Sequence, residues 1–235
     1  MIKLINNEFV KVKKSKLILT EILYIISIIV INKYSDKSIF DLVFNLIPFI
    51  GIIVCILYGG IISKERENGN LRFYLTKPVK RWKVYLSKFI SIMLYIIVSN
   101  IIIVCTVILI NGYDKLFIIK YIKHSIPVFF IGSYILYLST VFKSQTFSSS
   151  FGIITLSFSL LISQLLFGIR ITFVEYTFLP YLDFSLFNDE LVLNEINNDL
   201  GVNLSMNRGV IIDIIYMIIF YLIGNYKFIK KDIKS

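Results

Sequence analysis

The chain has 235 residues, of which 57% are hydrophobic and only 17% are charged, and its mean hydropathy is +0.78. A soluble domain of this length needs a polar surface that this composition does not supply, so a soluble globular protein is excluded. The net charge of +10 does not require nucleic acid as a partner, because anionic lipid or an acidic protein partner explains it equally well.

The chain begins with an amphipathic segment at residues 1–16. Ile2, Ile5, Phe9 and Val12 recur at helical spacing, and lysines surround the remaining positions. This pattern predicts a helix that lies in the inner membrane interface and leads into the first span. An ordinary basic flank is the alternative interpretation.

Six apolar runs follow, and each is long enough for a helix to cross a bilayer core of about 30 Å. Their interiors carry almost no charge and lack the alternation that is typical of barrel strands. Backbone groups in lipid must form hydrogen bonds within their own segment, which favours helices. The sequence therefore predicts an all-α polytopic membrane protein with a single transmembrane domain over residues 1–235. The six predicted spans are 17–32, 39–62, 89–110, 116–142, 147–169 and 209–229.

The distribution of Lys and Arg predicts the orientation of these spans. If the N-terminus lies in the cytosol, most of the 25 Lys and Arg residues fall in inner segments. Basic residues concentrate on the cytoplasmic side of membrane proteins, so the sequence favours an N-in, C-in arrangement. We therefore expect a multi-pass protein of the cell (plasma) membrane.

The densest group of charges lies at residues 64–88, between the second and third spans. Gly69 interrupts a short helix there, and Pro78 suits the first turn of a new helix. Between them, Leu71 and Phe73 belong to a short apolar knob that is surrounded by charge, which is a common mark of a protein contact. A basic loop with interfacial anchors is the alternative.

The longest outer segment, residues 170–208, is acidic, with an aromatic first half that contains Pro180. A segment this apolar should not extend into water. We expect it to dip back toward the membrane or to cap the neighbouring helices.

Three short motifs resemble those of ABC-2 type transporter permeases. The motif ERENGNL (65–71), then TKPVKR (76–81) and Lys88 at the start of the third span, resembles the cytoplasmic signature of this family. The tail KFIKKDI (227–233) resembles the usual ending of the family. Within the cytoplasmic signature, Asn70 and Lys80 are mild departures from the usual residues. The likeness covers essentially the whole chain, which resembles the small bacterial permeases of lantibiotic and bacitracin resistance.

The resemblance implies a type V exporter-like fold in which the segment between spans two and three docks on a separate ABC ATPase subunit. That subunit would bind ATP and Mg, leaving this chain without a cofactor. The resemblance further implies a second permease chain, identical or different. The positions that it assigns to ATPase coupling are Glu65, Arg66, Glu67, Gly69, Leu71, Phe73, Pro78 and Arg81.

The chain itself carries few groups that could supply energy or catalysis. It has no G-x-x-x-x-G-K-[ST] motif to hold ATP phosphates. The spans contain only Glu21, Asp41 and Asp213 as acidic residues, all near their ends, whereas a secondary transporter needs ionisable groups at depth. With His124 as its one histidine, the chain cannot assemble a metal site or a protease dyad, so we do not expect an enzyme.

The fifth span carries a stripe of small and polar residues. Measured from Ser148, the residues Gly152, Thr155, Ser159 and Ser163 fall within an arc of about 80° on a helix. Such a stripe allows close helix packing, which is the interpretation that we favour. The alternative is that it lines the translocation path or the seam between two permease chains.

These features support one leading hypothesis for the function. The chain would be the permease subunit of an ATP-driven exporter of an antimicrobial peptide, drug or similar amphipathic compound. The alternative is a standalone immunity or scaffold protein that sequesters a membrane-active peptide without transport. A membrane-embedded enzyme is the weakest candidate, because catalytic groups are missing.

Overall fold

The computed structural model describes residues 2–12, 14–34, 43–69, 80–169, 171–182, 187 and 190–230. These residues form helices and connecting turns, with no strand among them. Six of the helices are long and apolar enough to cross a membrane. The prediction of an all-α protein with six spans is therefore confirmed.

The helices follow the predicted spans closely. They are α1 (Ile2–Lys11), α2 (Lys14–Tyr34), α4 (Ile47–Tyr58), α5 (Ser63–Glu67), α7 (Arg81–Asn111), α8 (Lys115–Val141), α9 (Gln145–Gly168), α10 (Glu190–Leu200) and α11 (Met206–Lys230). Two short 3-10 helices, η1 (Thr172–Tyr176) and η2 (Leu179–Tyr181), precede α10.

Two predicted boundaries differ from the structure. The N-terminal helix was expected over 1–16, but α1 ends at Lys11 and residues 14–16 already belong to the spanning helix α2. The second span was expected as one helix over 39–62, yet the regular helix begins only at Ile47, with Pro48 in its first turn. Proline fits there because a first-turn N–H has no helical partner to lose.

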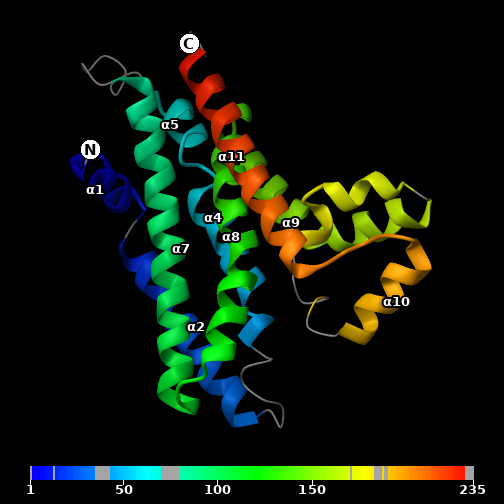
Figure 1. The fold of residues 1–235 in the computed structure, drawn as a ribbon. Coiled ribbons are helices and arrows are strands. Elements are labelled where there is room, and N and C mark those ends of the chain that lie inside the picture. The colour runs from blue at the N-terminus through cyan, green and yellow to red at the C-terminus, as the bar shows by residue number, and fades with distance from the viewer. Residues whose placement is uncertain are drawn as a thin grey trace.

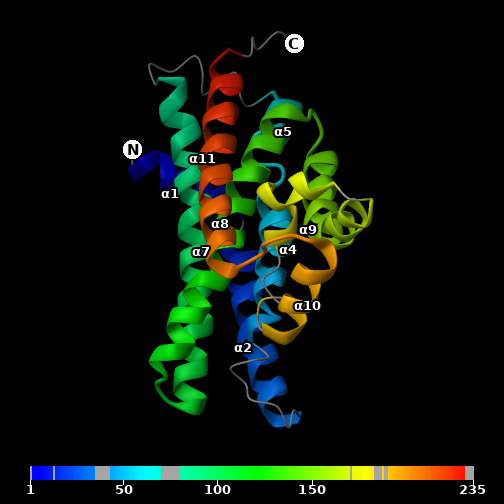
Figure 2. The same cartoon turned by 45° about the vertical axis from the view of Figure 1, so that its right-hand side comes forward.

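The long helix α8 lies at the centre of the bundle and packs against α4, α7, α9 and α11 (Figures 1 and 2). Most of α8 is buried, whereas α2 and α11 expose rows of Ile and Leu. Exposed apolar rows on spanning helices are the surfaces that face lipid. Figure 1 shows α7 running the full height of the bundle, with α9 and α10 extending to one side of it.

The second span breaks into α4 and α5, and a serine of α8 stabilises the break. The hydroxyl of Ser139 accepts hydrogen bonds from the backbone N–H groups of Ile62 (2.9 Å) and Ser63 (3.0 Å). Just before the break, Gly59 lies so close to α9 that a Cβ there would meet Ser149 Cα at 2.9 Å. The position therefore requires glycine.

The outer segment folds onto the bundle, as its aromatic composition predicts. Phe178, between η1 and η2, packs its ring 4.9 Å from that of Phe130 on α8 and 5.2 Å from that of Tyr216 on α11. Glu175 of η1 forms an ion pair with Arg208 of α11 at 3.3 Å. This segment therefore packs against the middle of α8 and of α11, and against the first turn of α11 through Arg208.

Candidate functional site

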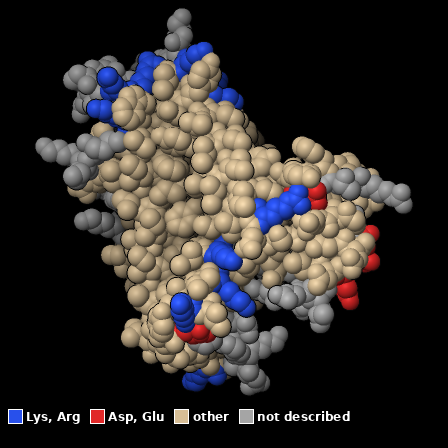
Figure 3. Space-filling model, viewed as in Figure 1, with Lys and Arg blue, Asp and Glu red and all other residues tan. Residues whose placement is uncertain are grey.

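The motifs singled out in the sequence meet at one end of the bundle. The helix α5, the start of α7 and the end of α11 all lie at the same end, where Figure 3 shows Lys and Arg side chains gathered. This is the end that the charge distribution predicts to face the cytosol. We call it the inner end.

Four charged side chains interlock at the inner end, and we call them the inner charge cluster: Glu8, Lys11, Glu65 and Lys88. Lys88 Nζ lies 2.9 Å from Glu8 Oε2 and 2.8 Å from Glu65 Oε2, and it donates a hydrogen bond to Ile61 O at 2.9 Å. Lys11 Nζ lies 2.6 Å from Glu8 Oε1 and also pairs with Glu65. Each carboxylate thus lies between two ammonium groups, and the cluster joins α1, α5 and α7.

The cluster is buried and electrically balanced. The side chain of Lys88 is fully buried, those of Glu8 and Glu65 are 5% and 10% exposed, and that of Lys11 is 33% exposed. Burial alone disfavours a charged amine, but the two carboxylates outweigh this effect and raise the pKa of Lys11. Two positive and two negative charges compensate one another, which makes their burial tolerable.

The local sequence explains why these groups meet. Glu8 and Lys11 are three residues apart in α1, so they lie on the same face of that helix. On α7, Lys88 falls on the face that is also formed by the buried residues Tyr85, Ile92 and Tyr95. A lysine on a buried face needs counter-charges, which α1 and α5 supply.

Two arginines of the motifs tie helix ends together. Arg66 donates to the backbone carbonyls of Thr140 (3.0 Å) and Phe142 (3.3 Å) at the C-terminal end of α8. Arg81 donates to the carbonyl of Ile229 (2.9 Å) near the end of α11. Carbonyls at a helix C-terminus lack helical partners and favour positive charge. The inner ends of α5, α7, α8 and α11 are thereby linked.

The predicted coupling residues divide into two groups. Glu65 and Arg66 point into the bundle, whereas Glu67 is exposed and Gly69 has the left-handed φ of 69° with open space around it. Leu71, Phe73 and Pro78 lie outside the described residues. The described surface available to a docking partner therefore centres on the turn after α5.

The stripe of the fifth span faces the interior of this chain. A Cβ on Gly152 would meet Ile135 of α8 at 2.8 Å and Cys55 of α4 at 2.9 Å, so α9 packs closely against both helices. Thr155 is only half-buried, and its hydroxyl lies 3.4 Å from that of Tyr134. The alternative, that the stripe lines the translocation path or the seam between two permease chains, remains a prediction. The fully buried members of the stripe are Ser148, Gly152, Ser159 and Ser163.

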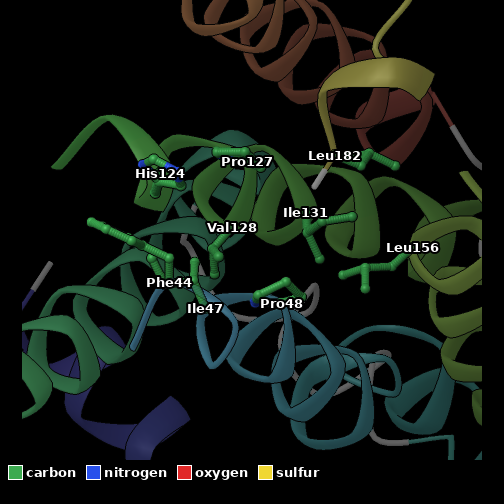
Figure 4. A pocket seen from close by; sticks show the side chains of 9 residues that line it. All are labelled: Phe44, Ile47, Pro48, His124, Pro127, Val128, Ile131, Leu156 and Leu182. Atoms are coloured by element: carbon green, nitrogen blue, oxygen red, sulfur yellow. The ribbon is translucent and has the colours of Figure 1, made fainter. Parts of the chain in front are cut away.

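The remaining candidate groups have mostly structural partners. Glu21 accepts a hydrogen bond from Ser99 at 2.6 Å. His124 stacks on Phe44 with ring centroids 4.3 Å apart, beside a small apolar pocket between α4 and α8 (Figure 4). Among the described residues, no three His, Cys, Asp or Glu side chains gather as metal ligands.

Sequence reasoning missed the contribution of α1 to this site. Glu8 and Lys11 fall within the predicted interfacial helix 1–16 and were given no role in the site, although Glu8 is the one acidic residue among the lysines of that segment. That isolated carboxylate, together with Lys88 on an apolar helix face, was the signal that a charge pair forms between distant segments.

A search of the curated proteins finds no relative of this chain. A comparison with protein families does find one, described as ABC-2 family transporter protein, and its profile matches residues 6–233. The match includes all six spanning helices and all four members of the inner charge cluster. The chain therefore belongs to the ABC-2 family of transporter proteins.

Proposed function

We propose that the chain is the permease subunit of an ATP-driven exporter and that the inner charge cluster transmits the movement of a docked ATPase to the spanning helices. Membership of the ABC-2 family indicates a membrane component of an ABC transporter, a role that calls for a separate ATPase. The observation that supports this proposal most directly is that the buried Lys88 of α7 pairs with both Glu65 of α5 and Glu8 of α1. A push on the turn after α5 is thereby passed to two other helices.

Residues 65–69 have two different roles in this proposal. Glu67 and Gly69 would contact the partner, because they lie on the surface. Glu65 and Arg66 would transmit, because they are bonded to other helices at the inner end. The resemblance supports export of an antimicrobial peptide, drug or similar amphipathic compound from the cell membrane, by two permease chains acting together.

The test is co-purification of the chain with an ABC ATPase subunit that is co-expressed with it. Gly69→Pro should abolish the complex, because proline cannot adopt the φ of 69° and the turn must change shape. The matched control is Gly112→Pro, since Gly112 also has a positive φ (84°) with open space around it but lies between α7 and α8 at the outer end. That control should leave the complex intact.

A second variant separates docking from transmission. Glu65→Gln removes one charge from the inner charge cluster without altering the exposed turn. We expect the complex to form while cargo-stimulated ATP hydrolysis falls about tenfold or more. An unchanged complex with Gly69→Pro, or protection of cells by the chain with no ATPase present, would refute the proposal. The second result would support a standalone immunity protein instead.

A further inference from the structure

The outer third of α11 contains a buried carboxyl group for which the described residues supply no hydrogen-bond or ion-pair partner. Asp213 is completely buried, and neither of its side-chain oxygens has a hydrogen-bond partner among the described residues. Nor does any described lysine or arginine lie within ion-pair distance of it. With a rise of 1.5 Å per residue, Asp213 lies about 10 Å along the helix from Met206.

Three polar groups at this end of the bundle have other partners. Arg208, on the same helix, pairs with Glu175 and lies 4.6 Å from the ring centroid of Tyr176. The hydroxyl of Tyr181, whose side chain lies within electrostatic reach of Asp213, donates to the backbone carbonyl of Glu175 at 3.1 Å. On α8, Lys123 is hydrogen-bonded to an asparagine side chain of α11.

An ionised Asp213 would thus be a single negative charge in an interior that excludes water. Such a charge is costly to bury, and proteins avoid it by protonation or by pairing. The structure offers no pairing among the described residues, which favours the protonated carboxyl group in this arrangement. An ionisable group inside a membrane bundle is expensive to keep and marks a functional position.

Aromatic rings gather on the side of α11 that carries this carboxyl group. Tyr216 follows Asp213 by three residues and so shares its side of α11. The ring of Phe178, from the outer segment, inserts between Tyr216 (5.2 Å) and Phe130 of α8 (4.9 Å). If the outer segment lifted, Phe178 would leave and the faces of the other two rings would open beside Asp213. A carboxylate flanked by aromatic faces is a site for an organic cation.

We propose that Asp213 and the rings of Phe130 and Tyr216 form a binding site for a lipophilic organic cation. When the outer segment lifts, the O–H bond of the Asp213 carboxyl group breaks and its proton passes to water. The carboxylate then pairs with the cationic group, so one proton leaves for each cation bound. That this cation belongs to the exported cargo rests on the proposed function, but the site itself does not require the ATPase.

The test uses the full chain in lipid nanodiscs, without ATPase or nucleotide, and tetraphenylphosphonium as the probe. In weakly buffered solution with a pH indicator, the wild type should bind the probe saturably and release one proton per bound cation. Asp213→Asn should weaken binding at least tenfold and abolish the proton release. Glu21→Gln is the matched control, because it alters another intramembrane carboxyl group and should change neither measurement.

Two further variants sharpen the test. Glu175→Gln weakens the ion pair that holds the outer segment and should raise the rate of probe binding. Arg170 lies outside the described residues, so Arg170→Gln is measured as well. If Arg170→Gln destabilises the chain and Asp213→Asn restores it, Asp213 is ion-paired and the proposal fails. It also fails if the wild type shows no saturable binding, or if Asp213→Asn releases protons like the wild type. Failure here leaves the docking test at Gly69 unaffected.

Discussion

The two ends of the bundle bury acidic side chains in opposite ways. At the inner end, Glu8 and Glu65 each lie between two lysine ammonium groups, and the charges cancel. At the outer end, Asp213 is buried at least as deeply with no partner among the described residues. Compensated charges hold elements together, because separating them exposes each to an unfavourable environment. An uncompensated carboxyl group instead remains available to exchange a proton for another ligand.

The two ends also differ in the contacts that hold their parts together. The inner charge cluster joins three helices, and Arg66 and Arg81 link further helix ends to it. The outer segment is held to α11 by the Glu175–Arg208 ion pair, by the ring of Phe178 and by an apolar cluster that includes Tyr181, Val210 and Ile212. Between them runs α7, an unbroken helix of 31 residues that spans about 46 Å. We infer that inner movements pass along the bundle as a unit, while the outer segment can lift separately.

The largest effect should come from removing the central cation of the inner charge cluster. Lys88→Met leaves two buried carboxylates to share Lys11, and breaking a buried pair in this way costs about 3–5 kcal/mol. Chemical unfolding of the purified chain in mixed micelles measures the loss. The control is Lys83→Met on the same helix, where the side chain is exposed and little change is expected.

A second substitution distinguishes charge balance from packing in the same experiment. Adding Glu65→Gln to Lys88→Met restores equal numbers of positive and negative charges, leaving the Glu8–Lys11 pair. Part of the lost stability should therefore return. If the double variant is less stable than Lys88→Met alone, charge compensation is not what stabilises the inner end.

A smaller loss of stability should come from adding a methyl group where α4 packs against the inner end of α9. The same change at the outer end of α9 should have little effect. Gly59→Ala places a methyl group where Ser149 Cα lies at 2.9 Å, so α4 and α9 must move apart. We expect a loss of about 3 kcal/mol, the upper end of the usual range for overpacking. Gly168→Ala, at the other end of α9, meets no atom within 4 Å and should be neutral or slightly stabilising. Equal losses for both variants would contradict this difference.

The sequence predicted the spans well because crossing a membrane is a local property. An apolar run of sufficient length forms a helix in lipid whatever its neighbours are, so five of the six spans agree closely with the helices. The second span was predicted as one helix because its break depends on α8. The hydroxyl that supports the break belongs to Ser139, which is 77 residues away from Ile62 in the chain.

The candidate site was only partly predictable for a related reason. The family motifs drew attention to Glu65, Arg66 and Lys88, but nothing in them indicates a partner in α1. Glu8 and Lys88 are 80 residues apart, and their pairing exists only once α1 packs on α7. In the same way, Asp213 looked like an ordinary residue near the interface. Its complete burial depends on how α11 packs against the rest of the chain, which its own sequence does not specify.

The smallest effect should be a pH dependence of the outer segment. Burial acts to raise the pKa of Glu175, but hydrogen bonds from Asn203 N–H and Tyr176 and the charge of Arg208 together lower it below 4.5. A carboxyl group with a lowered pKa stabilises the folded arrangement above its unfolded pKa, and this contribution is lost as the pH falls. An ion pair of this kind contributes roughly 0.2–1 kcal/mol.

Acidification should therefore loosen the outer segment. A fluorophore on Ile171→Cys, in a chain whose exposed Cys105 is replaced by Ser, reports the position of η1. Its signal should change as the pH falls below 4.5, and Glu175→Gln should show the low-pH signal already at neutral pH. A signal that does not respond to pH in the wild type would mean that Glu175 does not hold the segment. The apolar contacts of the segment would then hold it, both the ring of Phe178 between Phe130 and Tyr216 and the cluster that Tyr181 forms with α9 and α11.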